Sequence, residues 1–119
     1  TAAIAYERFL DAGGFDMTLS PTLMRAPEKL GVMALTEPDT MGEAVQSFAP
    51  HCAVFNQMGA PAMSVPLHWT GPTPTAPSGL PLGMMFGSRY GTESLLFALA
   101  GQLERSAPWA HRKPPVWVA

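Results

Sequence analysis

The cysteine and the histidines are the first residues to examine for chemistry, because thiols and imidazoles often serve as nucleophiles and bases. His51 and Cys52 are adjacent in the sequence. Adjacent side chains do not readily face each other, and a nucleophile usually meets its base across the fold. We therefore interpret Cys52 as a buried, unreactive thiol.

The remaining histidines do not form a metal-binding pattern. His68 and His111 are far apart in the sequence and have neither a second cysteine nor paired carboxylates beside them. We therefore expect no metal site. The charged pairs Glu104–Arg105 and Arg112–Lys113 are interpreted as solvated surface charges.

An asparagine and a nearby glycine form the most interesting pair, Asn56 and Gly59. The amide of Asn56 could hydrogen-bond a substrate, whereas the alternative is a turn in which both residues have a purely structural role. Phe48, Phe55 and Met58 could line an apolar pocket, although such residues more often belong to a core. Our candidate substrate-binding residues are Phe48, Phe55, Asn56 and Met58.

Composition restricts the class of protein. The chain has 119 residues, of which 47% are hydrophobic and 13% are charged, too apolar for a disordered tail. Its longest apolar stretches are far shorter than the ~20 residues of a membrane span. The net charge of -2 and the scattered basic residues argue against a nucleic-acid partner. A single cysteine excludes an internal disulfide and favours a reducing compartment, so we expect a cytoplasmic protein.

Periodicity and turn residues predict an alternation of short helices and strands. We predict helices over residues 2–12, 40–48 and 91–105 and a helical turn over 53–58. We predict strands over residues 15–20, 61–67 and 80–86, a loop over 71–79 and an extended tail over 111–119. Gly13 and Gly14 should end the first helix, Pro21 should end the first strand, and Thr92 should cap the last helix.

Several short motifs, taken in order, resemble the C-terminal part of amidase-signature hydrolases. The most informative block is the sequence FNQMGAPAMSVP at residues 55–66, which resembles the family's strand with the pattern Pro-Ala-x-Ser-x-Pro. The other blocks are Asp16 to Thr22, Gly79 to Gly83 and Gly91 to Leu96. The tail over residues 107–115 is similar to a subgroup that hydrolyses cyclic oligoamides of the nylon type, the 6-aminohexanoate cyclic dimer hydrolase-like amidases.

This resemblance implies an α/β fold, the C-terminal part of the amidase-signature fold, in which a mixed β-sheet is flanked by helices. Residues 1–119 would form a C-terminal fragment of an amidase domain. The family hydrolyses amide bonds with a Ser–Ser–Lys centre in a glycine-rich serine loop, and no serine or lysine of this chain has that context. The resemblance thus implies a centre outside this chain, no cofactor, and a turn at Asn56 near the substrate cleft.

The partners implied are a small-molecule amide substrate and the rest of the amidase chain, and a homo-oligomer is left open. Two other hypotheses compete with this one. The chain could be a non-catalytic accessory or binding module that retains a remnant of the amidase fold. It could also be an unrelated α/β domain with chance matches, although the order of the motifs argues against that.

Overall fold

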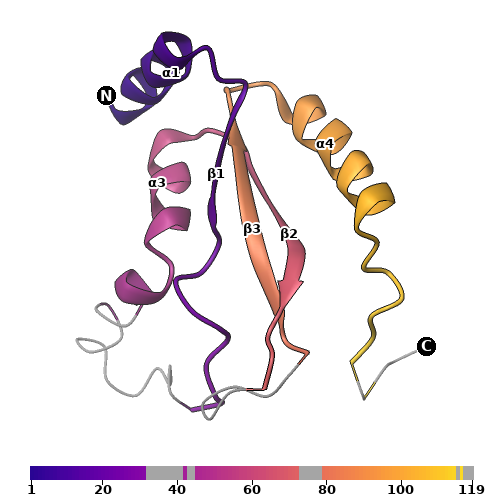
Figure 1. Cartoon of the computed structure of the whole chain (residues 1–119). Coiled ribbons are helices and arrows are strands. Elements are labelled where there is room, and N and C mark those ends of the chain that lie inside the picture. The colour runs from indigo at the N-terminus through magenta and orange to yellow at the C-terminus, as the bar shows by residue number, and fades with distance from the viewer. Residues whose placement is uncertain (32–41, 43–44, 73–78, 115, 117–119) are drawn as a thin grey trace.

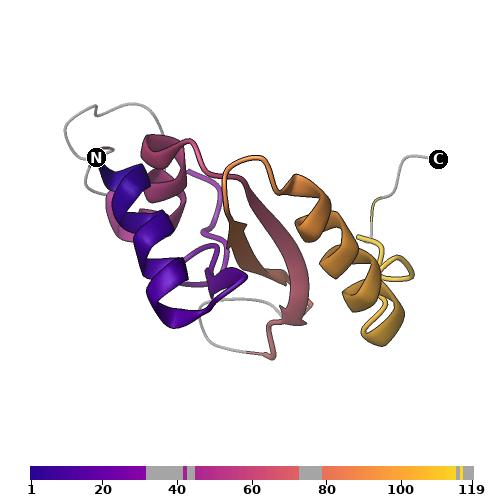
Figure 2. The same cartoon turned by 90° about the horizontal axis from the view of Figure 1, so that it is seen from above.

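A computed structural model describes residues 1–31, 42, 45–72, 79–114 and 116 of the chain. Three strands form an antiparallel sheet in the order β1–β3–β2. Helices α1 and α3 lie on one side of this sheet and α4 lies on the other (Figures 1 and 2). The elements are α1 (Ala2–Gly13), β1 (Met17–Pro21), α3 (Pro50–Met58), β2 (Ala62–Trp69), β3 (Pro81–Ser88) and α4 (Glu93–Ser106).

The α/β class and the flanking of the sheet by helices are confirmed, and most predicted elements are found with shifted ends. The predicted helical turn over residues 53–58 is a full helix, because Pro50 begins it at a position where no amide hydrogen is needed. Residues 45 to 48 are helical. Gly42 is helical as well, and the remaining residues of the helix predicted over 40–48 and most of the loop predicted over 71–79 lie outside the described residues.

Pro21 was predicted to end the first strand, and it is the last residue of β1. The backbone N–H of Thr22 donates to the carbonyl of Gly83 at 3.0 Å. The backbone N–H and C=O groups of the even-numbered residues of β1 therefore point toward β3, and those of the odd-numbered residues point away from it. The nitrogen of Pro21 therefore points away from the sheet, where a missing donor costs nothing. The same alternation directs the nitrogen of Pro66 outward from β2, because Ser88 donates to Pro61 on the inner side.

The helix ends agree only partly with the predicted caps. Gly14 ends α1 and Gly59 ends α3 in the left-handed conformation, with φ of 62° and 70°, which only glycine adopts without strain. Thr92 does occupy the N-cap position of α4, but its hydroxyl makes no capping bond to the helix. It donates instead to the carbonyl of Arg89 at 2.7 Å, and thereby fixes the turn between β3 and α4.

The two faces of the sheet carry different side chains and are covered by different helices. One face, which we call the glycine face, carries Gly83, Met85 and Gly87 on β3. Phe55 and Cys52 of α3 pack on it, and Met85 is only 4% exposed. On the opposite face α4 packs against β2 and β3, where Val65 is buried. The helices therefore cover opposite corners of the sheet.

Both flanking strands have one uncovered face as a consequence. Leu19, on the α4 side of β1, is 60% exposed, and Ser64 on the glycine face of β2 is exposed. Among the described apolar residues, only Leu10, Val65, Met85 and Leu96 are buried.

Two glycines in β3 allow this packing. A Cβ atom at Gly87 would overlap the ring of Phe55, and a Cβ atom at Gly83 would contact the hydroxyls of Thr22 and Ser64. The missing side chains thus create a recess in the centre of the sheet. The Phe55 ring fills one end of it, and Tyr6 of α1 packs edge-on against that ring with centroids 5.8 Å apart.

The recess at Gly87 leads to a first prediction. Gly87→Ala should lower the free energy of unfolding by roughly 1–3 kcal/mol, because the added methyl group displaces the Phe55 ring. Urea denaturation at matched protein concentration measures this. Gly71→Ala is the control, since a Cβ atom there meets nothing within 4 Å. Phe55→Leu in the Gly87→Ala background should restore part of the loss, and equal effects of Gly87→Ala and Gly71→Ala would contradict the packing argument.

Candidate functional site

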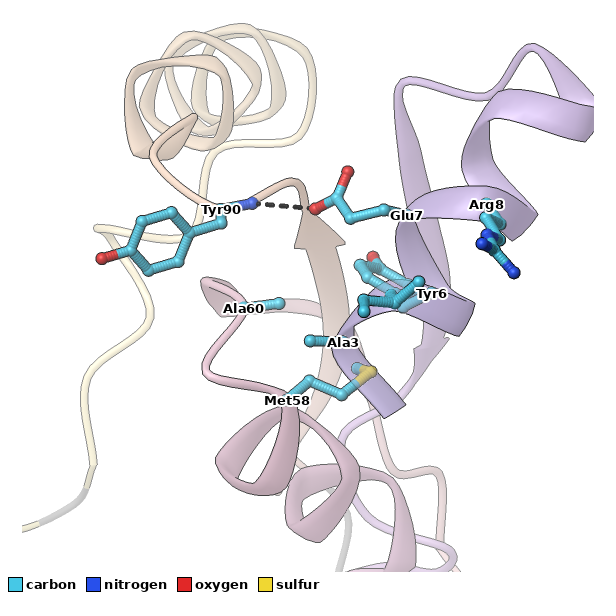
Figure 3. Close-up of a pocket in the computed structure, with 8 residues that line it drawn as sticks. Ala3, Tyr6, Glu7, Arg8, Met58, Ala60 and Tyr90 are labelled. Carbon is cyan, nitrogen blue, oxygen red and sulfur yellow. Dashed lines mark hydrogen bonds between the residues drawn. The ribbon is translucent and has the colours of Figure 1, made fainter. Parts of the chain in front are cut away.

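An apolar pocket near the predicted residues lies between α1 and the end of α3 (Figure 3). We call it the α1–α3 pocket, and its volume is about 260 Å³. Met58 closes it from below, Tyr90 stands at its rim, and one face of α1 forms its wall. The described lining residues are Ala3, Ile4, Tyr6, Glu7, Arg8, Met58, Ala60 and Tyr90. None of these carries a thiol, an imidazole, an amine or an aliphatic hydroxyl, so the pocket can hold an apolar group but cannot supply a strong nucleophile.

The four predicted site residues do not converge on one pocket. Met58 is half-buried and points its sulfur toward α1 in the α1–α3 pocket. Phe55 is directed at the sheet, where its ring covers Gly87. Phe48 lies in a separate pocket with Leu23 and Leu30. Their participation in substrate binding stays a prediction.

Asn56 occupies the last turn of α3 and is exposed. Its amide forms no hydrogen bond with any other residue that the structure describes, so it does not cap the turn that follows. Gly59 alone supplies that turn through its left-handed backbone. The structural interpretation therefore holds for Gly59, while the side chain of Asn56 keeps both its donor and its acceptor available.

Two hydroxyls meet over the recess at Gly83, where they are the closest pair of potential nucleophiles. The oxygens of Thr22 and Ser64 are 2.6 Å apart, and either can be the donor. The thiol of Cys52 donates to the backbone carbonyl of Thr22 at 3.4 Å. Within the described residues, no lysine or histidine hydrogen-bonds any of these three groups. The cluster therefore joins β1, β2 and α3, and it lacks a base that could activate a nucleophile.

Other types of functional centre are also missing from the described part of the chain. No group of three or more His, Cys, Asp or Glu side chains there could hold a metal ion. None of the helices in that part combines the length and the hydropathy that crossing a membrane requires. The described residues thus include pocket-lining side chains and groups that can bind a ligand, but no catalytic centre.

A charged cluster fastens α1 to the turn between β3 and α4. Arg89 contacts Glu7 at 2.8 Å and Asp11 at 2.9 Å, and Glu7 also accepts the backbone N–H of Tyr90 at 3.3 Å. The hydrogen bond to Glu7 is the main cause that raises the pKa of Arg89, with attraction to Asp11 adding to it against desolvation. The guanidinium therefore stays charged throughout the working pH range.

Sequence reasoning missed this cluster. None of Glu7, Asp11 and Arg89 was singled out as a candidate. The spacing of four residues between Glu7 and Asp11 places both carboxylates on one face of α1, a signal that they could share a cation. The cation is Arg89, which lies 78 or more residues away in the sequence, so no nearby sequence pattern indicates that it pairs with these carboxylates.

Comparisons with known proteins place the chain among amidases. A family model described as Amidase matches residues 3–97. A Mycobacterium tuberculosis protein named "Putative amidase AmiC" is 35% identical over 103 residues, covering 87% of this chain and 20% of that protein. The 6-aminohexanoate-cyclic-dimer hydrolase of Paenarthrobacter ureafaciens is 30% identical over 115 residues, covering 91% of this chain and 22% of the hydrolase.

Solved structures agree with the sequence relatives. A structure of 6-aminohexanoate cyclic dimer hydrolase superimposes with a TM-score of 0.78 at 30% identity, covering 95% of this chain and 23% of that one. A structure of the same hydrolase complexed with substrate matches equally well. The chain thus spans about a fifth of the length of the relatives it matches.

The charged cluster leads to a second prediction. Arg89→Gln should loosen α1, because it removes both contacts from Arg89 to the carboxylates of that helix. Hydrogen–deuterium exchange should then become faster in peptides from residues 1–13, while α4 keeps its protection. Arg8→Gln is the matched control, since Arg8 is an exposed arginine of α1 without a described ion pair. Unchanged exchange in α1 of Arg89→Gln would show that the cluster does not hold the helix.

Proposed function

The chain belongs to the amidase family, and from this premise we propose that it is part of an amidase that hydrolyses the carbon–nitrogen bond of a small-molecule amide. The observation that carries this proposal is the structural match to an amide-bond hydrolase over 95% of the chain at 30% identity. The proposed substrate class follows from that relative, whose name specifies a cyclic dimer of 6-aminohexanoate. A cytoplasmic location is part of the proposal, and the single cysteine supports it.

We place the catalytic Ser–Ser–Lys centre outside residues 1–119. In the complete enzyme, one serine attacks the amide carbonyl, a second serine assisted by lysine transfers protons, and backbone N–H groups stabilise the oxyanion. Within the described residues, the most tightly paired hydroxyls, those of Thr22 and Ser64, have no base, and no metal-binding group of side chains is present. Both observations support a scaffold role for this segment.

The exposed corners of the sheet support a second part of the proposal, that the rest of an amidase chain packs against this segment. Leu19 is 60% exposed on the uncovered face of β1, and Phe15, whose ring packs against Phe9 of α1, is 49% exposed. Apolar side chains of this size are stabilised when another surface removes them from water. We infer that the part of an amidase that this segment does not cover, about four-fifths of the matched relatives, supplies such a surface.

The end of α3 is the part of this segment that we propose for the wall of the substrate cleft. The exposed amide of Asn56 can both donate to and accept from a substrate amide. Met58 lies about half a helical turn beyond Asn56. It lines an apolar pocket that could hold an alkyl portion of the substrate. In this proposal Phe55 supports the helix from the sheet side, and Phe48 contributes at the opposite end of the same helical region.

The alternative is a non-catalytic accessory or binding module that retains part of the amidase fold. The observation that favours it is that the described residues contain no catalytic centre. The three candidate nucleophiles, those of Thr22, Ser64 and Cys52, have no base beside them. The two hypotheses differ in whether a reactive serine belongs to the same native protein.

A serine-directed fluorophosphonate probe provides the third prediction. The native protein should react with the probe, and peptide mass spectrometry should map the label to a serine outside residues 1–119. Labelling should abolish turnover of a simple aryl anilide, and the 119-residue chain alone should give no turnover. A native protein that neither reacts nor turns over the anilide would support the accessory module. A label on Ser64, or turnover by the 119-residue chain, would overturn the placement of the centre.

Asn56 provides the fourth prediction, measured on the native amidase. Asn56→Ala should raise KM for the amide substrate by roughly fivefold or more while kcat changes less, because a substrate hydrogen bond is lost. Stability should not change, since Asn56 is exposed. Gln57→Ala is the matched control, being an exposed amide at the next position. Equal kinetics for both variants would remove Asn56 from the cleft wall.

A further inference from the structure

A second pocket lies between the end of β2 and the segment that follows α4, away from α1 and α3. Its volume is about 550 Å³, and it is open to solvent on one side. Its described walls combine aromatic, basic and apolar groups, from Leu67, His68, Trp69, Pro108, His111 and Arg112. This size is within the range of small-molecule sites. We call it the Trp69–Arg112 pocket.

Arg112 is held in this pocket by an aromatic ring. Its guanidinium carbon lies 4.1 Å from the centroid of the Trp69 ring, so the planar group is positioned over the indole. Its backbone N–H donates to the carbonyl of Trp109 at 2.9 Å, which fixes the main chain as well. Sequence reasoning took Arg112 for a solvated surface charge, and the structure shows an exposed side chain with a defined orientation.

The guanidinium still has its hydrogen-bonding edge available. No carboxylate of the described residues forms an ion pair with Arg112, and stacking uses the face of the group rather than its N–H donors. This differs from Arg89, whose donors are engaged by Glu7 and Asp11. An arginine that is oriented by an aromatic ring and has free donors is suited to bind a carboxylate through two parallel hydrogen bonds.

The other described walls favour an anion with an apolar portion. His68 and His111 add two imidazoles that can donate hydrogen bonds, and no described lining residue is acidic. Leu67 and Pro108 provide the apolar part of the wall. From these features we propose that the Trp69–Arg112 pocket binds a small organic carboxylate, with its carboxylate on Arg112 and its alkyl portion against Leu67 and Pro108.

This ligand class has a relation to the proposed function, because hydrolysis of an amide releases a carboxylate. Only that relation rests on the proposed function, whereas the charge and shape of the pocket do not. Binding is measured without turnover, so a failure to bind would leave amide hydrolysis untouched. Conversely, a protein without hydrolytic activity could still bind a carboxylate here.

The fifth prediction tests this site by titrating the whole chain with sodium hexanoate in a calorimeter at constant ionic strength. Hexanamide, a neutral compound of the same shape, should bind at least about tenfold more weakly, because it loses the charge-assisted bonds to Arg112. Arg112→Gln should weaken hexanoate binding by a similar factor. Arg112→Lys should lie between the two, since it keeps the charge and loses the planar pair of donors.

Matched controls separate the pocket from general charge effects. Arg105→Gln removes the same charge from the exposed end of α4, where the side chain does not line the Trp69–Arg112 pocket, and should leave hexanoate affinity unchanged. Trp69→Leu should weaken binding several-fold by releasing Arg112 from its orientation while leaving an apolar wall. Circular dichroism of each variant verifies that the fold is retained.

Four results would overturn the proposal. These are the absence of hexanoate binding to the unsubstituted chain, equal binding of hexanamide, unchanged affinity in a folded Arg112→Gln variant, and equal or tighter binding of inorganic phosphate. The last result would show a general anion patch without preference for an organic carboxylate.

Discussion

The packing of this chain depends on the absence of side chains at two positions of its central strand. Gly83 and Gly87 lie on one face of β3 and leave a recess that Phe55 enters from α3. Because this contact sets the position of α3, it also sets where Asn56 and Met58 emerge at the end of that helix. Tyr6 then docks α1 against the same ring, and its hydroxyl reaches Thr18 at 3.0 Å. A local property of one strand thus determines the geometry of the proposed cleft wall.

The sequence predicted correctly those elements whose structure depends on interactions between residues close together in the chain. The periodicity of the last helix and the left-handed glycine after the first helix gave correct elements, because both depend on residues within one or two turns. Pro21 ends β1 as predicted, but that it still pairs within the strand could not be foreseen, because this depends on which edge of the strand faces a neighbour, and that register is set by β3, more than 60 residues away. The same limit applies to the site: the stacking of Arg112 on Trp69 joins residues 43 positions apart and has no local signature.

The described residues divide structural support from chemistry. The hydroxyl and thiol groups that could act as nucleophiles, those of Thr22, Ser64 and Cys52, are engaged with one another or with backbone and hold strands and helix together. Without an adjacent base to take up their protons they are weak nucleophiles. The groups that remain available, the amide of Asn56 and the guanidinium of Arg112, are binding groups. This division is what a supporting segment of a larger hydrolase requires, with reactivity concentrated elsewhere.

The outward nitrogens of Pro21 and Pro66 have a consequence for how this sheet behaves in a crowded solution. Each outer strand offers only a short ladder of amide donors before a proline interrupts it. Fibril growth by strand addition needs an uninterrupted edge, on which each arriving chain repeats the hydrogen bonds of the last. Apolar strands such as these are prone to that growth, and a proline at the edge acts as a gatekeeper against it. The two prolines thus limit the addition of further strands at the edges of the sheet, while the strands themselves stay apolar enough to be buried.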